Sequence, residues 1–302
     1  MGHAIGQEFA LAGFQVNFFD QSPPIRQVLK SRINKNLNEM LEWKLVEEEQ
    51  VKSAMTRVNI FSNLADAVSV ADLVVEAVFE VLEVKQQLFT QLDQLCPANT
   101  ILASNTSSLM PSSLAASTQR PEKVLVLHYF YPPHLMPLVE IVKSSETAQE
   151  TADAVYEAVI ETGKKPIVTE KEALGFVANR LQAALLREAM YLIEQGICSP
   201  QDVDIAVKFG FGRRLAHVGP IELAEVQDGW LQMSQIAGYI FPDLNNDTSP
   251  SPIIAEKIAK NELGPQTGKG FYEWSPERVA EFERQLYEQL ARYIRADHNE
   301  EE

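Results

Sequence analysis

The sequence predicts an α/β protein with a doubly wound parallel sheet in its first half and an all-helical second half. In the first half, short apolar segments with strand character alternate with helical segments, whereas beyond residue 173 the pattern is helical. A chain of 302 residues with 45% hydrophobic content can bury two moderate cores. We therefore expect two domains, residues 1–170 and residues 171–302.

The strands expected in the first half are short apolar runs without clean alternation, which is typical of strands buried on both faces. Helices are expected at residues 3–12, 25–44 and 84–95. Strands are expected at residues 14–19, 58–60, 72–78, 100–104, 123–130, 138–142 and 166–169. This alternation predicts a parallel sheet that is covered by helices on both faces.

The helices expected in the second half have recognisable ends. Residues 181–194 carry apolar residues at helical spacing, and Gly196 follows as a C-cap. The next helix begins with Ser199 as N-cap and Pro200 at its first position. Residues 276–296 form a charged amphipathic pattern, which predicts a last helix before the acidic end of the chain.

Charge and cysteine content narrow the class of protein. A net charge of −16 argues against nucleic acid and anionic membrane surfaces as partners, because both attract clustered Lys and Arg. No apolar run is long enough to span a bilayer, and the N-terminus lacks signal-peptide features. Cys96 and Cys198 are far apart in the sequence and need not pair. We expect a cytoplasmic protein without a metal site.

The first twenty residues, MGHAIGQEFALAGFQVNFFD, match the second half of a Rossmann-type dinucleotide-binding unit. Asp20 lies eighteen residues after Gly2, the spacing between the third glycine of a G-x-G-x-x-G loop and the acid that binds the adenosine ribose. A carboxylate there favours NAD over NADP, because it would repel a 2′-phosphate. The first strand and the first two glycines are missing, and an ordinary helix-to-strand unit explains this half-motif about as well.

Polar residues follow two expected strands at the edge where open α/β sheets bind ligands. They lie in residues 104–109, SNTSSL, and in residues 128–133, HYFYPP. His128 and Glu140 flank a proline-rich turn, so a carboxylate can orient a histidine that accepts a proton. A lone histidine would more often be structural. Because Glu140, Ser107 and Asn179 accompany it, we interpret His128 as a general base.

These motifs resemble the L-3-hydroxyacyl-CoA dehydrogenase family. They are also close to the branch that contains lambda-crystallin, the L-gulonate 3-dehydrogenase. The resemblance covers nearly the whole chain. It is carried by SNTSSL, HYFYPP, LVE at 138–140, GFVANR at 175–180 and TGKGFY at 267–272.

The resemblance implies roles for individual residues. His128 is expected to be the catalytic base, Glu140 its carboxylate partner, and Ser107 and Asn179 the residues that hold the substrate oxygens. For the cofactor NAD, the resemblance implies contacts from Gly2, Asp20, Ala77, Glu80, Lys85 and Ser107. Without it, Glu80 and Lys85 would be interpreted as an ordinary solvated helix start.

Three departures from the family pattern stand out. Tyr131 replaces an Asn beside the nicotinamide, and Gln266 replaces a Lys before the last motif, although we expect both still to lie near the cofactor. The start is also missing. Since a Met commonly precedes the third glycine, we expect that translation was assigned to an internal Met codon. The chain as written is then expected to fold poorly in its first half and to bind NAD weakly.

The resemblance implies oxidation of an L-3-hydroxyacyl-CoA, but two alternatives stay open. Arg26, Lys30, Arg32 and Lys35 lie on one expected helix and suit coenzyme A phosphates, although a solvated helix face explains them equally well. The alternatives are a dehydrogenase of a free hydroxy acid or sugar acid such as L-gulonate, and a non-catalytic protein. We also expect a homodimer through residues 181–275.

Overall fold

The computed structural model of the protein describes residues 1–227 and 229–300, with side chains as far as residue 297. The chain forms two compact units, Met1–Asn179 together with Glu283–Glu302, and Arg180–Phe282. This differs from the expected division at residue 170, because the first unit extends to Asn179 and also includes the end of the chain. The reason lies in contacts distant in sequence, such as the hydrogen bond from Arg295 Nη1 to the carbonyl of Trp43.

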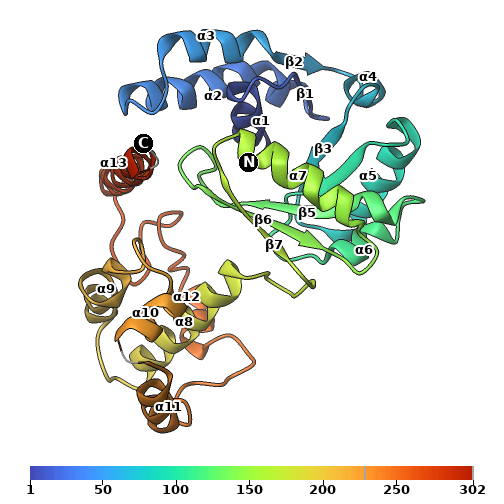
Figure 1. The fold of residues 1–302 in the computed structure, drawn as a ribbon. Coiled ribbons are helices and arrows are strands. Elements are labelled where there is room, and N and C mark those ends of the chain that lie inside the picture. Colours follow the sequence, from blue (N-terminus) through green and yellow to red (C-terminus); the bar gives the residue numbers. More distant parts are fainter. Residues whose placement is uncertain (228, 301–302) are drawn as a thin grey trace. The chain divides into compact units, whose positions relative to one another are not determined.

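The first unit is built from strands and helices in alternation (Figure 1). Its helices include α7, which was not expected from the sequence. In chain order the elements are α1 (Gly2–Leu11), β1 (Val16–Phe19), α2 (Pro23–Glu42), α3 (Glu48–Thr56), β2 (Val58–Phe61), α4 (Leu64–Val68), β3 (Leu73–Glu76), α5 (Leu82–Leu95), β4 (Ile101–Ser104), α6 (Pro111–Ala115), β5 (Val124–Tyr129), β6 (Leu138–Lys143), α7 (Gln149–Glu161) and β7 (Lys165–Thr169).

The strands form a two-stranded sheet, β1-β2, and a five-stranded sheet in the order β3-β4-β5-β6-β7. Neighbours are parallel except β5 and β6, which are antiparallel. The expected Rossmann-type parallel sheet is thus present, and only the pair β5-β6 departs from the parallel arrangement. The connection between β5 and β6, residues 130–137, is too short for a crossover, which needs about a dozen residues or more. This connection therefore reverses the direction of the chain, so that β6 runs antiparallel to β5.

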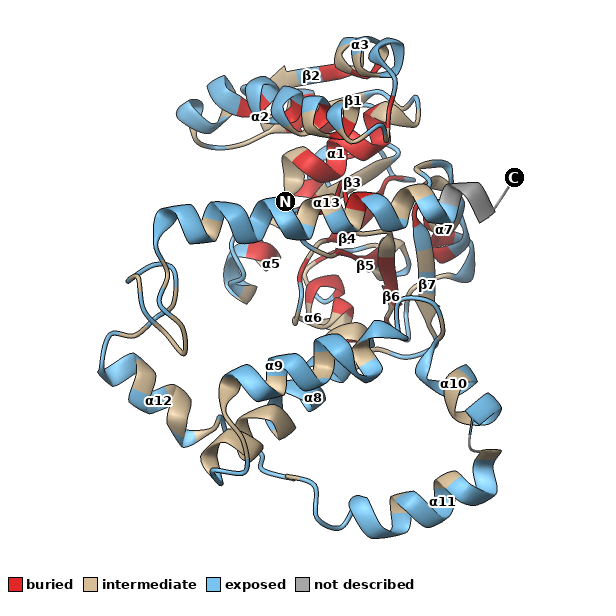
Figure 2. Ribbon diagram, turned by 90° about the vertical axis from the view of Figure 1, so that its left-hand side faces the viewer, coloured by how far each residue is buried: buried red, intermediate tan, exposed pale blue. Residues whose placement is uncertain are grey.

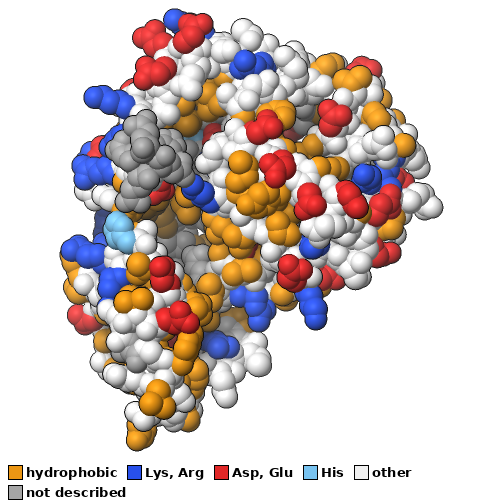
Figure 3. Space-filling model, in the orientation of Figure 1, with side chains coloured by type: hydrophobic (Ala, Val, Ile, Leu, Met, Phe, Trp, Pro, Cys, Tyr) orange, Lys and Arg blue, Asp and Glu red, His pale blue; other side chains and the backbone are white. Residues whose placement is uncertain are grey.

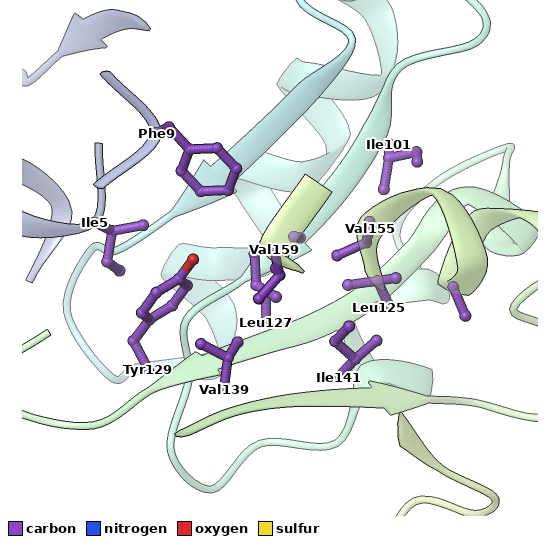
Figure 4. Packing of buried hydrophobic residues seen from close by; sticks show 12 residues of the cluster. Ile5, Phe9, Ile101, Leu125, Leu127, Tyr129, Val139, Ile141, Val155 and Val159 are labelled. Carbon is purple, nitrogen blue, oxygen red and sulfur yellow. The ribbon is translucent and has the colours of Figure 1, made fainter. Parts of the chain in front are cut away.

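The core of the first unit has a layer on each face of the five-stranded sheet. Every residue of β5 is buried, and alternate side chains point to opposite faces. Leu125, Leu127 and Tyr129 pack with α1 and α7 (Figure 4), while Val124 packs with α5 and α6 on the other side. Burying one such aliphatic side chain stabilises the fold by about 1.5–3 kcal/mol. The centre of the sheet is thus a rigid base for the loops at the ends of its strands.

Helix α1 packs closely on β1, and a glycine makes this possible. A Cβ at Gly6 would lie 2.3 Å from the ring of Phe18 and 3.0 Å from Val16 Cγ1. No side chain larger than hydrogen fits there without displacing the ring of Phe18. Gly6 therefore sets the distance between the helix and the end of β1, where Asp20 follows.

The second unit is helical. It contains most of α8 (Ala178–Glu194), followed by α9 (Pro200–Phe209), α10 (Pro220–Gln227), α11 (Gly229–Ile240), α12 (Pro252–Ala259) and the start of α13 (Pro276–Glu300). The expected caps are confirmed. Gly196 has a φ of 65°, and the Asp202 N–H donates to Ser199 Oγ over 3.2 Å.

The described residues of the second unit include none that is buried (Figure 2). The first unit, in contrast, contains clusters of buried hydrophobic residues. None of the helices in the described part of the chain is both long and apolar enough to span a membrane.

Candidate active site

The site is organised around a buried histidine–carboxylate pair. His128 on β5 and Glu140 on β6 face each other in the antiparallel register, and Nδ1 of the histidine lies 2.8 Å from Oε2 of the carboxylate. Their side chains are 6% and 0% exposed. Because the carboxylate keeps the neutral imidazole protonated on Nδ1, the lone pair is left on Nε2. The pair can therefore accept a proton at Nε2.

The second oxygen of Glu140 is held by the start of α8. The N–H groups of Val177 and Ala178 donate to Oε1 over 2.9 and 3.0 Å. Burial raises the pKa of Glu140, but the hydrogen bonds from His128 and from these two N–H groups outweigh it, so the pKa is lower than usual. The group is an anion at neutral pH, and it stabilises the imidazolium that forms when His128 takes a proton.

The turn that presents these two N–H groups has an uncommon backbone. Gly175 and Phe176 have φ values of 75° and 54°, in the left-handed region. Such a conformation costs a non-glycine residue about 1–2 kcal/mol. At Phe176 it is offset by burial of the ring, which is 2% exposed and lies 5.4 Å from the His128 ring. The turn thus covers one side of the imidazole and satisfies its carboxylate.

Ser107 and Asn179, which were expected to hold substrate oxygens, are brought together. Nδ2 of Asn179 donates to the carbonyl of Ser107 over 3.2 Å. Asn179 directly follows Ala178, so both residues are connected to Glu140. The loop before Ser107 is joined to β5, because the N–H of Tyr129 donates to Asn105 Oδ1 over 2.9 Å. The four residues expected from the sequence to be catalytic therefore share one hydrogen-bonded region.

The structure places Glu80 and Lys85 differently from each other. Glu80 is partly exposed and accepts hydrogen bonds from Thr106 and Ser108. Burial raises the pKa of Glu80, but these hydrogen bonds and the charge of Lys85 outweigh burial, so the pKa is lower than usual. Lys85 is only 1% exposed, and the expectation that it contacts the cofactor stays a prediction. Its ammonium is held in the interior by Glu76, a residue that the sequence analysis missed although it is the one charge in the apolar strand LVVE.

The N-terminal end of α1 has the features of a dinucleotide site. The helix has no side-chain cap and no acidic residue in its first turn, so its N–H groups are available to an anion. Gly2 lies against Ala77, where an added Cβ would be 3.5 Å from the alanine Cβ. Asp20 follows β1, and its Oδ1 accepts from the Ser22 N–H over 2.7 Å. This arrangement leaves Oδ2 to receive ribose hydroxyls, so the residues fit NAD.

The basic residues of α2 do not form one cluster. Lys30 and Arg32 are two positions apart, which places them about 200° apart around the helix. Arg26 is bound to the carbonyl of Asp20, and Lys35 lies 3.8 Å from Glu39. Burial, then the terminal amine and Arg32, lower the pKa of His3 to about 4, so the charge of Arg32 acts on the first turn of α1. The expectation that these residues bind the phosphates of coenzyme A stays a prediction.

The two departures from the family pattern lie in different units. Tyr131 is 71% exposed, and its hydroxyl accepts from Tyr287 of α13 over 3.1 Å, within the first unit. Gln266 belongs to the second unit, where it is an exposed residue of the turn between the bridged residues Gly264 and Lys269. Among the described residues, no group of three or more His, Cys, Asp or Glu could hold a metal ion.

Comparisons with known proteins found chains that are similar over most of their length. The chain is 36% identical over 288 residues to the mitochondrial hydroxyacyl-coenzyme A dehydrogenase of Sus scrofa, covering 91% of this chain and 88% of the relative. It is 37% identical over 230 residues to the human lambda-crystallin homolog, covering 74% and 70%. The crystal structure of an NAD+-dependent dismutase, FHMPC 5-dehydrogenase, matches with a TM-score of 0.91 and 29% identity, covering 98% and 94%.

The family models match both parts of the chain. The NAD binding domain of 3-hydroxyacyl-CoA dehydrogenase matches residues 1–173, and the C-terminal domain matches residues 175–274. The expected family, its Rossmann-type fold and its cofactor NAD are thereby confirmed. The chain belongs to the 3-hydroxyacyl-CoA dehydrogenase family of NAD-dependent oxidoreductases.

Proposed function

We propose that the protein oxidises the 3-hydroxyl of an L-3-hydroxyacyl-CoA to the 3-oxoacyl-CoA. The observation that carries this proposal is the buried His128–Glu140 pair. The hydroxyl proton passes to Nε2 of His128 while the hydrogen on the same carbon leaves as hydride, and a C=O bond forms. NAD, when bound, accepts the hydride. Glu140 stabilises the imidazolium, and Ser107 and Asn179 position the substrate oxygens.

The thioester substrate is supported by the relatives. Besides the enzyme of Sus scrofa, the chain is 34% identical over 276 residues to a probable 3-hydroxybutyryl-CoA dehydrogenase of Bacillus subtilis. The charge of Arg32, which acts on His3 in the first turn of α1, also supports a ligand with phosphate groups.

A free hydroxy acid or sugar acid, such as L-gulonate, is the second candidate substrate. It is favoured by the separation of Lys30 from Arg32 around α2, which leaves no one-sided phosphate surface. The matches to the lambda-crystallin homolog and to FHMPC 5-dehydrogenase also support it.

NADH formation separates the two candidates. We would assay the protein with 3-hydroxybutyryl-CoA and with L-gulonate, and compare wild type with Arg32→Ala and Lys30→Ala. If the thioester is the substrate, Arg32→Ala raises KM for 3-hydroxybutyryl-CoA and Lys30→Ala serves as the matched control. Faster turnover of L-gulonate than of the thioester would overturn the proposal in favour of the second candidate.

We further propose a homodimer that forms through the second unit. A unit with no buried residue among those described has little to stabilise it alone. Large apolar side chains are exposed instead, including Val226 at 81%, Leu231 at 81% and Tyr239 at 85%. Apolar side chains are visible over α11 at the lower end of Figure 3. A second copy of the chain would cover these side chains. Light scattering at micromolar concentration gives the molar mass in solution, and the mass of a monomer would contradict the proposal.

A cytoplasmic location is also part of the proposal. It is supported by the two cysteines, Cys96 and Cys198, which are both free thiols. Fractionation of cells that express the protein tests this, and recovery from a secreted fraction would contradict it.

A further inference from the structure

Lys164 is a buried lysine between α7 and β7. Its side chain is 6% exposed, and its ammonium binds two elements that are distant from it in the sequence. Nζ lies 2.9 Å from Oε2 of Glu8 on α1, whose side chain is 5% exposed, and it donates to the carbonyl of Pro133 over 2.7 Å. This side chain therefore joins the helix of the dinucleotide site to the connection between β5 and β6.

The connection between β5 and β6 separates the two members of the histidine–carboxylate pair. It leads from the strand that carries His128 to the strand that carries Glu140, and the register of the two strands places these residues opposite each other. Within the connection, the N–H groups of Leu135 and Met136 both donate to the carbonyl of Pro132 over 3.0 Å, so it is a compact turn. A displacement of this turn would change how Nδ1 of His128 meets Oε2 of Glu140.

Further contacts hold Lys164 and its carboxylate partner in place. Lys165, the next residue, begins β7 and donates its N–H to the carbonyl of Pro137 over 2.9 Å. On α1, Nε2 of Gln7 donates to Oε1 of Glu8 over 3.3 Å. The backbone beside Lys164 and the carboxylate that it contacts are both fixed, so the ammonium holds the turn from a defined position.

A buried ion pair of this kind is better suited to fixing geometry than to adding stability. Removing two charges from water is costly, and their attraction in the interior does little more than offset that cost, so replacing both partners by uncharged residues is often tolerated. The hydrogen bond from Nζ of Lys164 to the Pro133 carbonyl, in contrast, is directional, and an apolar side chain cannot make it.

We propose that Lys164 is a positioning residue for catalysis. It holds the turn between β5 and β6 in place relative to α1, and thereby keeps His128 and Glu140 paired. It acts through the Pro133 carbonyl. The inference rests on the proposed role of the His128–Glu140 pair, but not on the identity of the substrate.

The test separates stability from positioning with two variants of the full chain. Lys164→Met leaves the Glu8 carboxylate buried without its partner, so we expect Tm to fall and kcat to fall about tenfold or more. Glu8→Gln combined with Lys164→Met removes the unpaired charge, but the bond to Pro133 is still missing. We therefore expect Tm to return towards the wild-type value while kcat stays low. A double variant with wild-type kcat would overturn the proposal, since the ion pair would then be merely structural.

A second ion pair of the first unit provides the matched control. Nε of Arg120 lies 2.7 Å from Oδ1 of Asp93, and their side chains are 13% and 11% exposed. Asp93→Asn is expected to lower Tm without changing kcat. An equal loss of kcat in Asp93→Asn would overturn the proposal, since destabilisation alone would then explain the result.

NADH fluorescence titration distinguishes positioning from cofactor binding. We expect the double variant to have the wild-type Kd for NADH, because the first turn of α1 keeps all of its groups and only the turn between β5 and β6 has lost a contact. A Kd that rises as much as kcat falls would overturn the proposal. If Lys164→Met does not fold, the double variant, in which neither charge remains, decides by itself.

The choice of substrate does not affect the comparison. We would measure kcat with whichever of 3-hydroxybutyryl-CoA and L-gulonate the wild type oxidises faster. A fully active double variant would overturn this inference alone, whereas a wild-type chain that is inactive with both substrates would overturn it together with the proposed function.

Discussion

Individual residues of this protein show which side chains the sequence could identify and which it could not. His128 and Glu140 were predicted because His128 lies near the end of one expected strand and Glu140 ends the motif LVE. The structure pairs them across the sheet. Glu76 was not predicted. Its partners Lys85 and Ser104 lie 9 and 28 residues further along the chain, so its burial depends on how three segments meet.

His134 gives a prediction on the pH dependence of stability. Its side chain is buried, both ring nitrogens lack a hydrogen-bond partner, and it is close to Lys164, His3 and Tyr287. Burial, then the charges of Lys164 and His3, lower its pKa to about 4 from an ordinary value of 6.5. Between those two pH values the unfolded chain binds the proton and the folded chain does not.

The contribution of neutral His134 to the free energy of unfolding is therefore fully present above about pH 6.5. It is lost as the pH drops towards 4, by up to about 3 kcal/mol. We expect His134→Phe, which keeps a ring of similar size, to flatten the fall in Tm between pH 7 and pH 4. If the Tm of wild type and of His134→Phe fell by the same amount between pH 7 and pH 4, the role of His134 would be refuted.

At the scale of elements, the turn before α8 gives a prediction with a built-in control. Gly175 and Gly163 have nearly the same φ, 75° and 73°, in the left-handed region. Alanine at either position should destabilise the protein by about 1–2 kcal/mol. Only Gly175→Ala should also reduce kcat, because it shifts the two N–H groups that hold Glu140. Equal kcat values for Gly175→Ala and Gly163→Ala would show that the turn does not support the site.

The elements also show where pattern reading succeeds and where it fails. Apolar runs located the strands, since β3, β4 and β5 all lie within their expected ranges. The direction of β6 was predicted incorrectly, because an apolar run is the same in either direction and only the connection length fixes it. The basic residues of α2 were grouped from their nearness in sequence, whereas a helix separates positions two apart.

For the whole molecule, the two compact units divide the chain at other residues than the domains expected from the sequence. The end of α13 belongs to the first unit because Tyr287 and Arg295 contact Tyr131 and Trp43, more than 150 residues earlier in the chain. No local pattern signals such contacts.

The second unit gives a prediction on assembly. Leu231 and Tyr239 lie on α11 and line a shallow depression with Ile236. Charged residues at a dimer interface would be buried without partners, so Leu231→Glu together with Tyr239→Glu should produce monomers with a lower Tm. Exposed Lys208→Glu on α9 controls for added charge alone. If the double variant has the same mass in solution as wild type, α11 is not at the interface.

The central claim is that His128, oriented by Glu140, is the general base of an NAD-dependent dehydrogenase. Its most direct test is the turnover of His128→Gln with 3-hydroxybutyryl-CoA at saturating NAD, measured beside its affinity for NADH. We predict that turnover falls about a hundred-fold to ten-thousand-fold while the Kd for NADH is unchanged, because the proton acceptor is lost and no cofactor contact is removed. A variant that keeps half of the wild-type turnover would contradict the account.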